Sequence, residues 1–204
     1  MNDTAMTIEQ TWRAVAAERA SLAELLASLS EHQWDHDSLC ADWRIRDVVA
    51  HIALSSNSDI ATILVNLIRA RLDLHGMIRD TAIRHAENTT AAQLLAELRA
   101  GIQLRRTPVG TTPADRLMDL LVHGQDIAIP LGITREMPIA AARLSLERVW
   151  TMGATFEARK QLAGNRLVAN DIDWTAGEGP VIEAPVGELL LLVTGRRTVR
   201  DLQN

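Results

Sequence analysis

The 204-residue chain lacks most of the side chains that usually carry nucleophilic or redox chemistry. It has no Tyr, one Phe, one Cys (Cys40) and a single Lys (Lys160) among its 21 basic residues. One Cys excludes an internal disulfide and is typical of a reducing compartment, so we expect a cytoplasmic protein. Any reactive centre must be built from the six His, the carboxylates, the hydroxyls and Arg.

Several classes of function lack their usual sequence signals. Residues 1–10 have no basic flank or apolar segment of a signal peptide, and no run of about 18 apolar residues predicts a membrane span. The net charge of −5 argues against a nucleic-acid partner and against an anionic membrane surface. No Gly-x-Ser-x-Gly elbow surrounds the serines at 55–58, and no glycine-rich phosphate loop is present, which disfavours a serine hydrolase and a nucleotide-binding protein.

The chain has the apolar content and periodicity of a helical protein. Its 47% hydrophobic residues are enough for a real core. Apolar residues recur every three or four positions, which is the period of amphipathic helices. This spacing predicts helices over 7–28, 45–68 (bent near 55–58), 88–102, 113–130 and 139–150, with one short turn at 30–34 and an Arg-rich polar connection around 75–85.

The C-terminal part has a different pattern. Two short β-branched segments, Arg166–Ala169 and Pro180–Glu183, are separated by a polar stretch that predicts a turn. A last helix is predicted from Val186 to Thr194, ending at Gly195. We therefore expect a mainly α protein, with an antiparallel helical bundle over residues 1–160 and a small α+β segment over residues 161–204 that packs on it.

The sharpest local feature is the pair Asp119 and His123. Four residues on a helix place both side chains on one face, within reach of one ion. Asp126 follows one turn later, where it can orient His123 or lie in solvent. A carboxylate and an imidazole are a common ligand pair, but a surface Asp beside a helical His explains the same spacing.

His51 lies inside an apolar run, where a buried imidazole needs a polar partner. Taken alone, it is a core histidine bonded to a carbonyl or hydroxyl, or a ligand. Cys40 is interpreted as a small core residue, because no His is close to it in the sequence to favour a thiolate. The other four histidines are expected in solvent: His32, His36, His75 and His85.

Three stretches together resemble a known family. They are Ser38–His51, which contains Cys40, Trp43 and Asp47, then Asp119–Ile127, and then Pro130–Gly132. They are similar to the maleylpyruvate isomerase family of mycothiol-dependent enzymes, within the DinB-like superfamily of metal-binding helical bundles. Trp174 and the segment from Gly187 to Arg196 also resemble the family's C-terminal part. The resemblance implies a DinB-like antiparallel four-helix bundle.

The resemblance also implies a site and a reaction. A divalent metal would be held by His51, Asp119 and His123, with Asp126 orienting His123. Two His and one carboxylate suit Zn best, and three ligands with open positions are typical of a catalytic ion. The cosubstrate would be mycothiol, whose thiolate adds to the cis double bond of a small electrophile before rotation and elimination. Asp119 stands where the family usually has Glu, one methylene longer.

The substrate and the oligomeric state are less determined. Arg196 and Arg197 are candidate anion-binding residues, or cations that complete the end of the last helix. The apolar helix faces leave a homodimer open. Two alternatives to the thiol-dependent enzyme remain: a metal-dependent hydrolase on the same scaffold, and a metal-free module for ligand binding or dimerisation.

Overall fold

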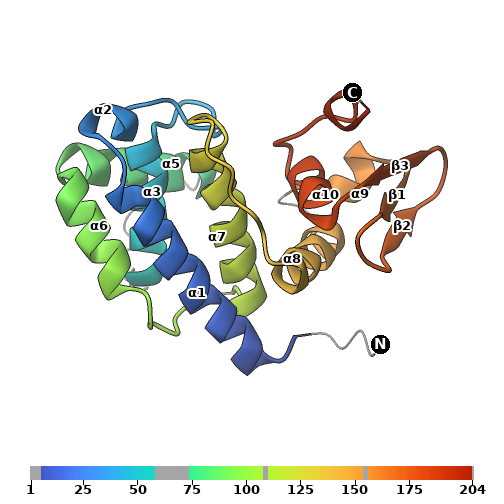
Figure 1. Cartoon of the computed structure of the whole chain (residues 1–204), viewed down its shortest axis with the longest axis horizontal. Helices are drawn as coiled ribbons and strands as arrows, with labels where there is room; N and C mark the ends of the chain where they lie inside the picture. Colours follow the sequence, from blue (N-terminus) through green and yellow to red (C-terminus); the bar gives the residue numbers. More distant parts are fainter. Residues whose placement is uncertain (1–5, 58–73, 108–109, 154–155, 204) are drawn as a thin grey trace. The chain divides into compact units, whose positions relative to one another are not determined.

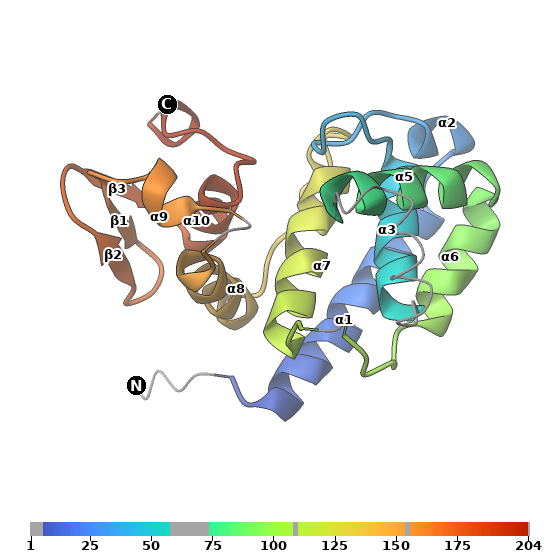
Figure 2. The ribbon, with the colours of Figure 1, turned by 180° about the vertical axis from the view of Figure 1, so that it is seen from behind.

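The computed structural model describes residues 6–57, 74–107, 110–153 and 156–203 (Figures 1 and 2). Its contacts divide the chain into two compact units. We call Trp12–Arg135 the helical unit, and Met1–Thr11 together with Glu136–Asn204 the mixed unit. Among the described residues, no helix is long and apolar enough to cross a membrane.

The helical unit is built around α3, which packs against α5, α6 and α7. Five apolar residues of α3 are completely buried: Ile45, Val48, Val49, Ala50 and Ile52. Figure 2 shows α3 among these neighbours. The helices are α1 (Ile8–Ala27, of which the part from Trp12 belongs here), α2 (Glu31–Trp34), α3 (Ile45–Asn57), α5 (Leu74–Glu87), α6 (Ala91–Ala100) and α7 (Pro113–Ala128).

Helix α7 has a well-defined start and is buried along most of its length. Thr112 and Asp115 form a capping box, in which the Asp115 carboxylate accepts from the Thr112 N–H at 2.7 Å. Pro113 occupies the first turn, where its missing N–H costs nothing. Near the other end, a Cβ on Gly124 would lie 2.9 Å from Nε of Arg135, so glycine makes room for this guanidinium.

The mixed unit combines two main helices with a three-stranded sheet of order β2-β1-β3. Strand β1 pairs antiparallel with β2 and parallel with β3, and α8 packs against α10. The mainly α class with a small C-terminal α+β segment is confirmed. The elements are α8 (Ile139–Thr151), α9 (Ala158–Gln161), β1 (Arg166–Ala169), β2 (Thr175–Gly177), β3 (Val181–Ala184), α10 (Val186–Val193) and η1 (Arg200–Leu202).

Most predicted helices are present close to their predicted bounds. The predicted second helix is α3, which is described as far as Asn57; its continuation over 58–68 lies outside the described residues. The polar connection predicted around 75–85 is wrong, because Leu74–Glu87 is helix α5. Its buried face is marked mainly by Met77, Ala82 and Ala86, and two small alanines give a weak apolar stripe.

The predicted turn between the two C-terminal strands is also wrong in part, because it contains β2. Its sequence Thr175-Ala-Gly177 has no alternation of apolar residues, and it is strand because it pairs with β1. Helix α9 is a further element without a sequence signal. The boundary expected after residue 160 stays a prediction.

Candidate metal centre

Three predicted ligand residues converge inside the helical unit. His51 comes from the middle of α3, and Asp119 and His123 lie one turn apart on α7. Oδ1 of Asp119 lies 3.4 Å from Nε2 of His51 and 3.4 Å from Nε2 of His123. One donor atom from each residue lies within 4.8 Å of the other two. The shorter Asp side chain therefore reaches both imidazoles.

These separations suit a shared ion better than direct hydrogen bonds. Strong N–H···O bonds span about 2.7–3.2 Å, so 3.4 Å is long for one. Ligand atoms about 2.0–2.2 Å from a tetrahedral ion stand roughly 3.3–3.6 Å apart. Both 3.4 Å distances from the Asp119 oxygen fall in that range. The residues present therefore fit a divalent ion bound by two nitrogens and one oxygen.

The three side chains are partly exposed and lie beside an aromatic ring. Their exposed fractions are 16% for His51, 22% for Asp119 and 12% for His123. The Trp43 ring lies 5.5 Å from the His51 ring and stacks near His123 at 6.2 Å, centroid to centroid. An ion held here would keep positions open to other ligands, as catalytic zinc sites do.

A buried arginine binds the second oxygen of Asp119. Nη1 of Arg116 donates to Oδ2 of Asp119 at 2.9 Å and to Oγ of Ser55 at 2.6 Å, and Nη2 donates to the Ser55 carbonyl at 2.7 Å. This arrangement leaves Oδ1 facing the two imidazoles. Burial alone would raise the pKa of Asp119, but His51 and His123 outweigh it and hold that pKa well below 3.8.

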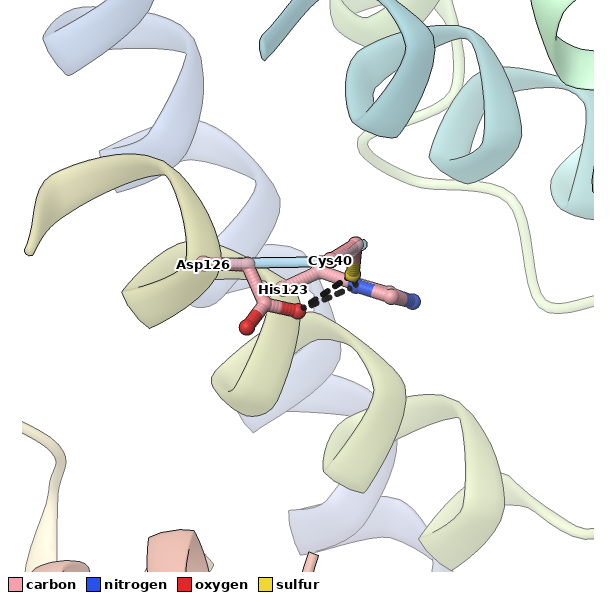
Figure 3. Close-up of side chains that lie close together, drawn as sticks. All are labelled: Cys40, His123 and Asp126. Atoms are coloured by element: carbon pink, nitrogen blue, oxygen red, sulfur yellow. Dashed lines mark hydrogen bonds and ion pairs between the residues drawn. The ribbon is translucent and has the colours of Figure 1, made fainter. Parts of the chain in front are cut away.

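Asp126 orients the ring of His123 by binding Nδ1, the ring nitrogen that does not face Asp119. Oδ2 of Asp126 lies 2.8 Å from Nδ1 of His123, and the Asp126 side chain is completely buried (Figure 3). A carboxylate only accepts, so Nδ1 carries the proton and Nε2 is the nitrogen that can bind a metal. Burial lowers the pKa of His123, but its contacts with Asp119, Asp126 and Cys40 outweigh this and raise that pKa well above 6.5.

Cys40 belongs to the same cluster, which the sequence did not predict. Its Sγ donates to Oδ2 of Asp126 at 3.0 Å and lies 3.8 Å from Nδ1 of His123. The interpretation of Cys40 as a core residue with no His nearby is wrong, because α7 brings His123 to it from 83 positions away. The spacing of neighbouring residues in the sequence holds no signal for such a contact.

The remaining predicted residues lie elsewhere. Arg196 donates to the Thr194 carbonyl at 2.8 Å, and Arg197 pairs with Glu188 at 3.1 Å, all within the mixed unit. Their role in binding substrate stays a prediction. His85, expected in solvent, lies on α5 with its Nε2 2.7 Å from Oε2 of Glu97.

Comparisons with known proteins bear on the family and the fold of the chain. A family model described as the mycothiol maleylpyruvate isomerase N-terminal domain matches residues 15–116, half of the chain. The matched part includes Cys40 and His51 and ends three residues before Asp119. No curated protein sequence matches the chain.

Two solved structures share the fold over nearly the whole chain. They are crystal structures of the mycothiol-dependent maleylpyruvate isomerase and of a mutant of that enzyme. The first is 14% identical and the mutant 13% identical; each has a TM-score of 0.66, with 94% of this chain and 90% of the other covered.

Proposed function

The chain belongs to the mycothiol maleylpyruvate isomerase N-terminal domain family, and we propose that it is a metal-dependent enzyme that uses a low-molecular-weight thiol, mycothiol, as cosubstrate. The metal, Zn by preference, is held by His51, Asp119 and His123. The substrate is a small electrophile, and the reaction is a cis–trans isomerisation or a transfer of the thiol. The family and the fold do not determine the metal, the thiol or the reaction. The assignment of these three rests on the geometry of the site.

One observation carries the proposal: the Asp119 oxygen stands 3.4 Å from the nitrogen of each imidazole. Two nitrogens and one oxygen are a ligand set that Zn accepts, with Ni, Fe and Mn as weaker alternatives. A divalent ion at this point would act as a Lewis acid that lowers the pKa of a coordinated thiol. The three ligands are partly exposed, so an ion held among them would be accessible from solvent.

The chain's own residues prepare the site for anionic partners. Asp126 holds the Nδ1 proton of His123, and Arg116 holds the outer oxygen of Asp119. Because Arg116 offsets the charge of Asp119, a divalent ion among neutral imidazoles leaves the site positively charged. This charge favours a thiolate and a carboxylate-bearing substrate over neutral ligands.

The thiol then serves as a nucleophile that the chain itself does not supply. Its addition to a cis double bond turns that bond into a single bond, about which rotation is free. Elimination of the thiol restores the double bond in the trans form, with no net redox change. A chain with one Cys and no Tyr can support this chemistry by holding an ion and orienting two small molecules.

Metal content is the first test. Protein purified without chelator should contain close to one equivalent of metal, and His123→Ala should contain none. His85→Ala is the matched control, because it removes a histidine of the same unit that pairs with Glu97. Metal retained in full by His123→Ala would overturn the ligand assignment.

Thiol dependence is the second test. Metal-loaded protein should convert a small electrophile, such as a cis-unsaturated keto acid, only when mycothiol is added. Turnover of a hydrolysable substrate without any thiol would replace the proposal by a metal-dependent hydrolase. A protein that binds no metal, and whose melting temperature Zn leaves unchanged, would be a metal-free binding module, because a ligand of the native state must stabilise it.

A further inference from the structure

Cys40 is held against α7 by the loop that precedes α3. The backbone N–H of Leu39 donates to the Asp126 carbonyl at 3.1 Å. Oγ of Ser38 accepts from the Cys40 N–H at 3.1 Å and donates to the Trp43 carbonyl at 2.8 Å. The position of Sγ is therefore set by three bonds around it, two within the loop and one to the helix that carries the site.

One oxygen of Asp126 receives two donors. Oδ2 accepts the S–H of Cys40 at 3.0 Å and the Nδ1–H of His123 at 2.8 Å (Figure 3). Distances of this size are hydrogen bonds, and they are shorter than the separations expected between ligands of one metal ion. Cys40, His123 and Asp126 also form a possible donor set for a metal, but these lengths favour a hydrogen-bonded chain.

We propose that Cys40 is a positioning residue for the metal ligand His123, acting through Asp126. The inference rests on the proposed function. The S–H bond fixes the buried carboxylate, and the carboxylate fixes the ring so that Nε2 faces Asp119 and His51. The S–H group donates to the same Oδ2 that accepts the Nδ1 proton of His123.

The expected effect follows from this order of contacts. Removing a direct partner of a metal-bound histidine typically weakens metal binding by about 10–100-fold. Cys40 acts one bond further from the ion, so its loss should weaken Zn binding by about tenfold, the lower end of that range. A hydroxyl in its place also donates to Oδ2, so Ser should restore most of the affinity.

The experiment compares two substitutions at Cys40. Cys40→Val removes the donor and keeps an apolar side chain, whereas Cys40→Ser keeps a donor. The Zn dissociation constant is measured by competition with a chelator, and thermal unfolding of the metal-free variants shows whether each is folded. We expect Cys40→Val to bind Zn about tenfold more weakly than the wild type, and Cys40→Ser to lie within about threefold of it.

A second readout isolates the path through Asp126. In an Asp126→Ala background, Cys40→Val should have little further effect on Zn affinity, because the acceptor that links Cys40 to His123 is gone. The visible absorption bands of the Co²⁺-loaded protein should change in Cys40→Val and return in Cys40→Ser. A purely structural role of Cys40 would change melting temperatures and leave these bands as they are.

Three results would overturn the inference in distinguishable ways. If Cys40→Val binds Zn as tightly as the wild type, Cys40 does not position His123, and the proposed function stands. If the wild type binds two equivalents of Cd²⁺ and Cys40→Ser binds one, then Cys40, His123 and Asp126 are themselves a metal site. If the wild type binds no metal at all, the proposed function and this inference both fail.

Discussion

Charged side chains at the candidate metal centre of the helical unit are buried, whereas an ion pair of the mixed unit is exposed. In the helical unit, the Arg116 side chain is 3% exposed and the Asp126 side chain is completely buried. Arg116 binds the candidate ligand Asp119, and Asp126 binds the candidate ligand His123. In the mixed unit, Arg197 and Glu188 form an ion pair with exposed fractions of 32% and 38%. Burying a charged group costs several kcal/mol unless ion pairing and hydrogen bonds offset the loss of hydration. An exposed ion pair costs little to form and contributes little to stability.

This difference points to function in the helical unit. A chain has no need to bury two carboxylates, two imidazoles and a guanidinium together for stability, because apolar residues would serve as well or better. Such clusters, with strongly shifted pKa values, are typical of functional sites. The Arg197–Glu188 pair of the mixed unit shows the opposite pattern, because both side chains lie partly in solvent.

The largest effect is expected from the residue that both imidazoles share. Asp119→Asn replaces the carboxylate by a neutral, weaker ligand, so Zn affinity should fall by more than about 100-fold. That factor is the upper end of the effect expected when a residue that only contacts a metal ligand is removed. Chelator competition measures this. The matched control is Asp80→Asn, an exposed carboxylate on α5 that pairs with Arg79 and should leave Zn binding unchanged. Equal loss in both variants would contradict the assignment.

Metal binding should depend on pH through His123. Its pKa lies well above 6.5 in the metal-free protein, so near neutral pH a proton must leave before Zn binds, whereas Asp119 is already ionised. Zn affinity should therefore rise with pH, up to about tenfold per unit, between 6.5 and the raised pKa. Calorimetry in buffers of different ionisation enthalpy counts the released proton.

The metal-free protein should show the opposite trend. A raised pKa in the folded state means that His123 contributes stability that is complete below 6.5 and is lost as the pH rises through its folded pKa. Denaturant unfolding with chelator present should show this loss. Zn affinity that does not change with pH would contradict the protonated state of His123.

Replacing Arg116 should change Zn binding less and should clearly lower the stability of the metal-free protein. Arg116→Met removes the partner of Oδ2 of Asp119 and two bonds to Ser55, while the three ligand atoms stay in place. Losing charged hydrogen bonds at a partly exposed carboxylate should lower the unfolding free energy of the metal-free protein by about 1–3 kcal/mol. The Zn stoichiometry should stay near one, and a value near zero would show that Arg116 sets the position of Oδ1.

The residues predicted as metal ligands lie close together, but only part of their surroundings was predicted from the sequence. Helical spacing pairs Asp119 with His123, the resemblance adds His51, and Asp126 follows from its place three residues after His123. Arg116 lies three residues before Asp119, so the same spacing rule could have found it. Cys40 could not be found in this way.

Two physical causes explain what the sequence did not predict. Cys40 meets α7 through a loop whose path depends on packing between segments more than 80 residues apart. Strand β2 has no apolar alternation and is strand only because β1 offers it partners. Helix α5 buries small alanines, which weaken its periodic signal. Spacing within one element is encoded locally, whereas contacts between elements are not.

The smallest effect is expected in the mixed unit. Arg197→Ala breaks an ion pair whose members are both about one-third exposed, so the unfolding free energy should fall by only about 0.2–1 kcal/mol. Zn affinity should be unchanged, in contrast to the variants of the helical unit. The steady-state parameters then decide the role predicted from the sequence. A raised KM for a dicarboxylate, with kcat unchanged, would mean that Arg197 binds substrate, and unchanged values would leave it as a surface ion pair at the end of α10.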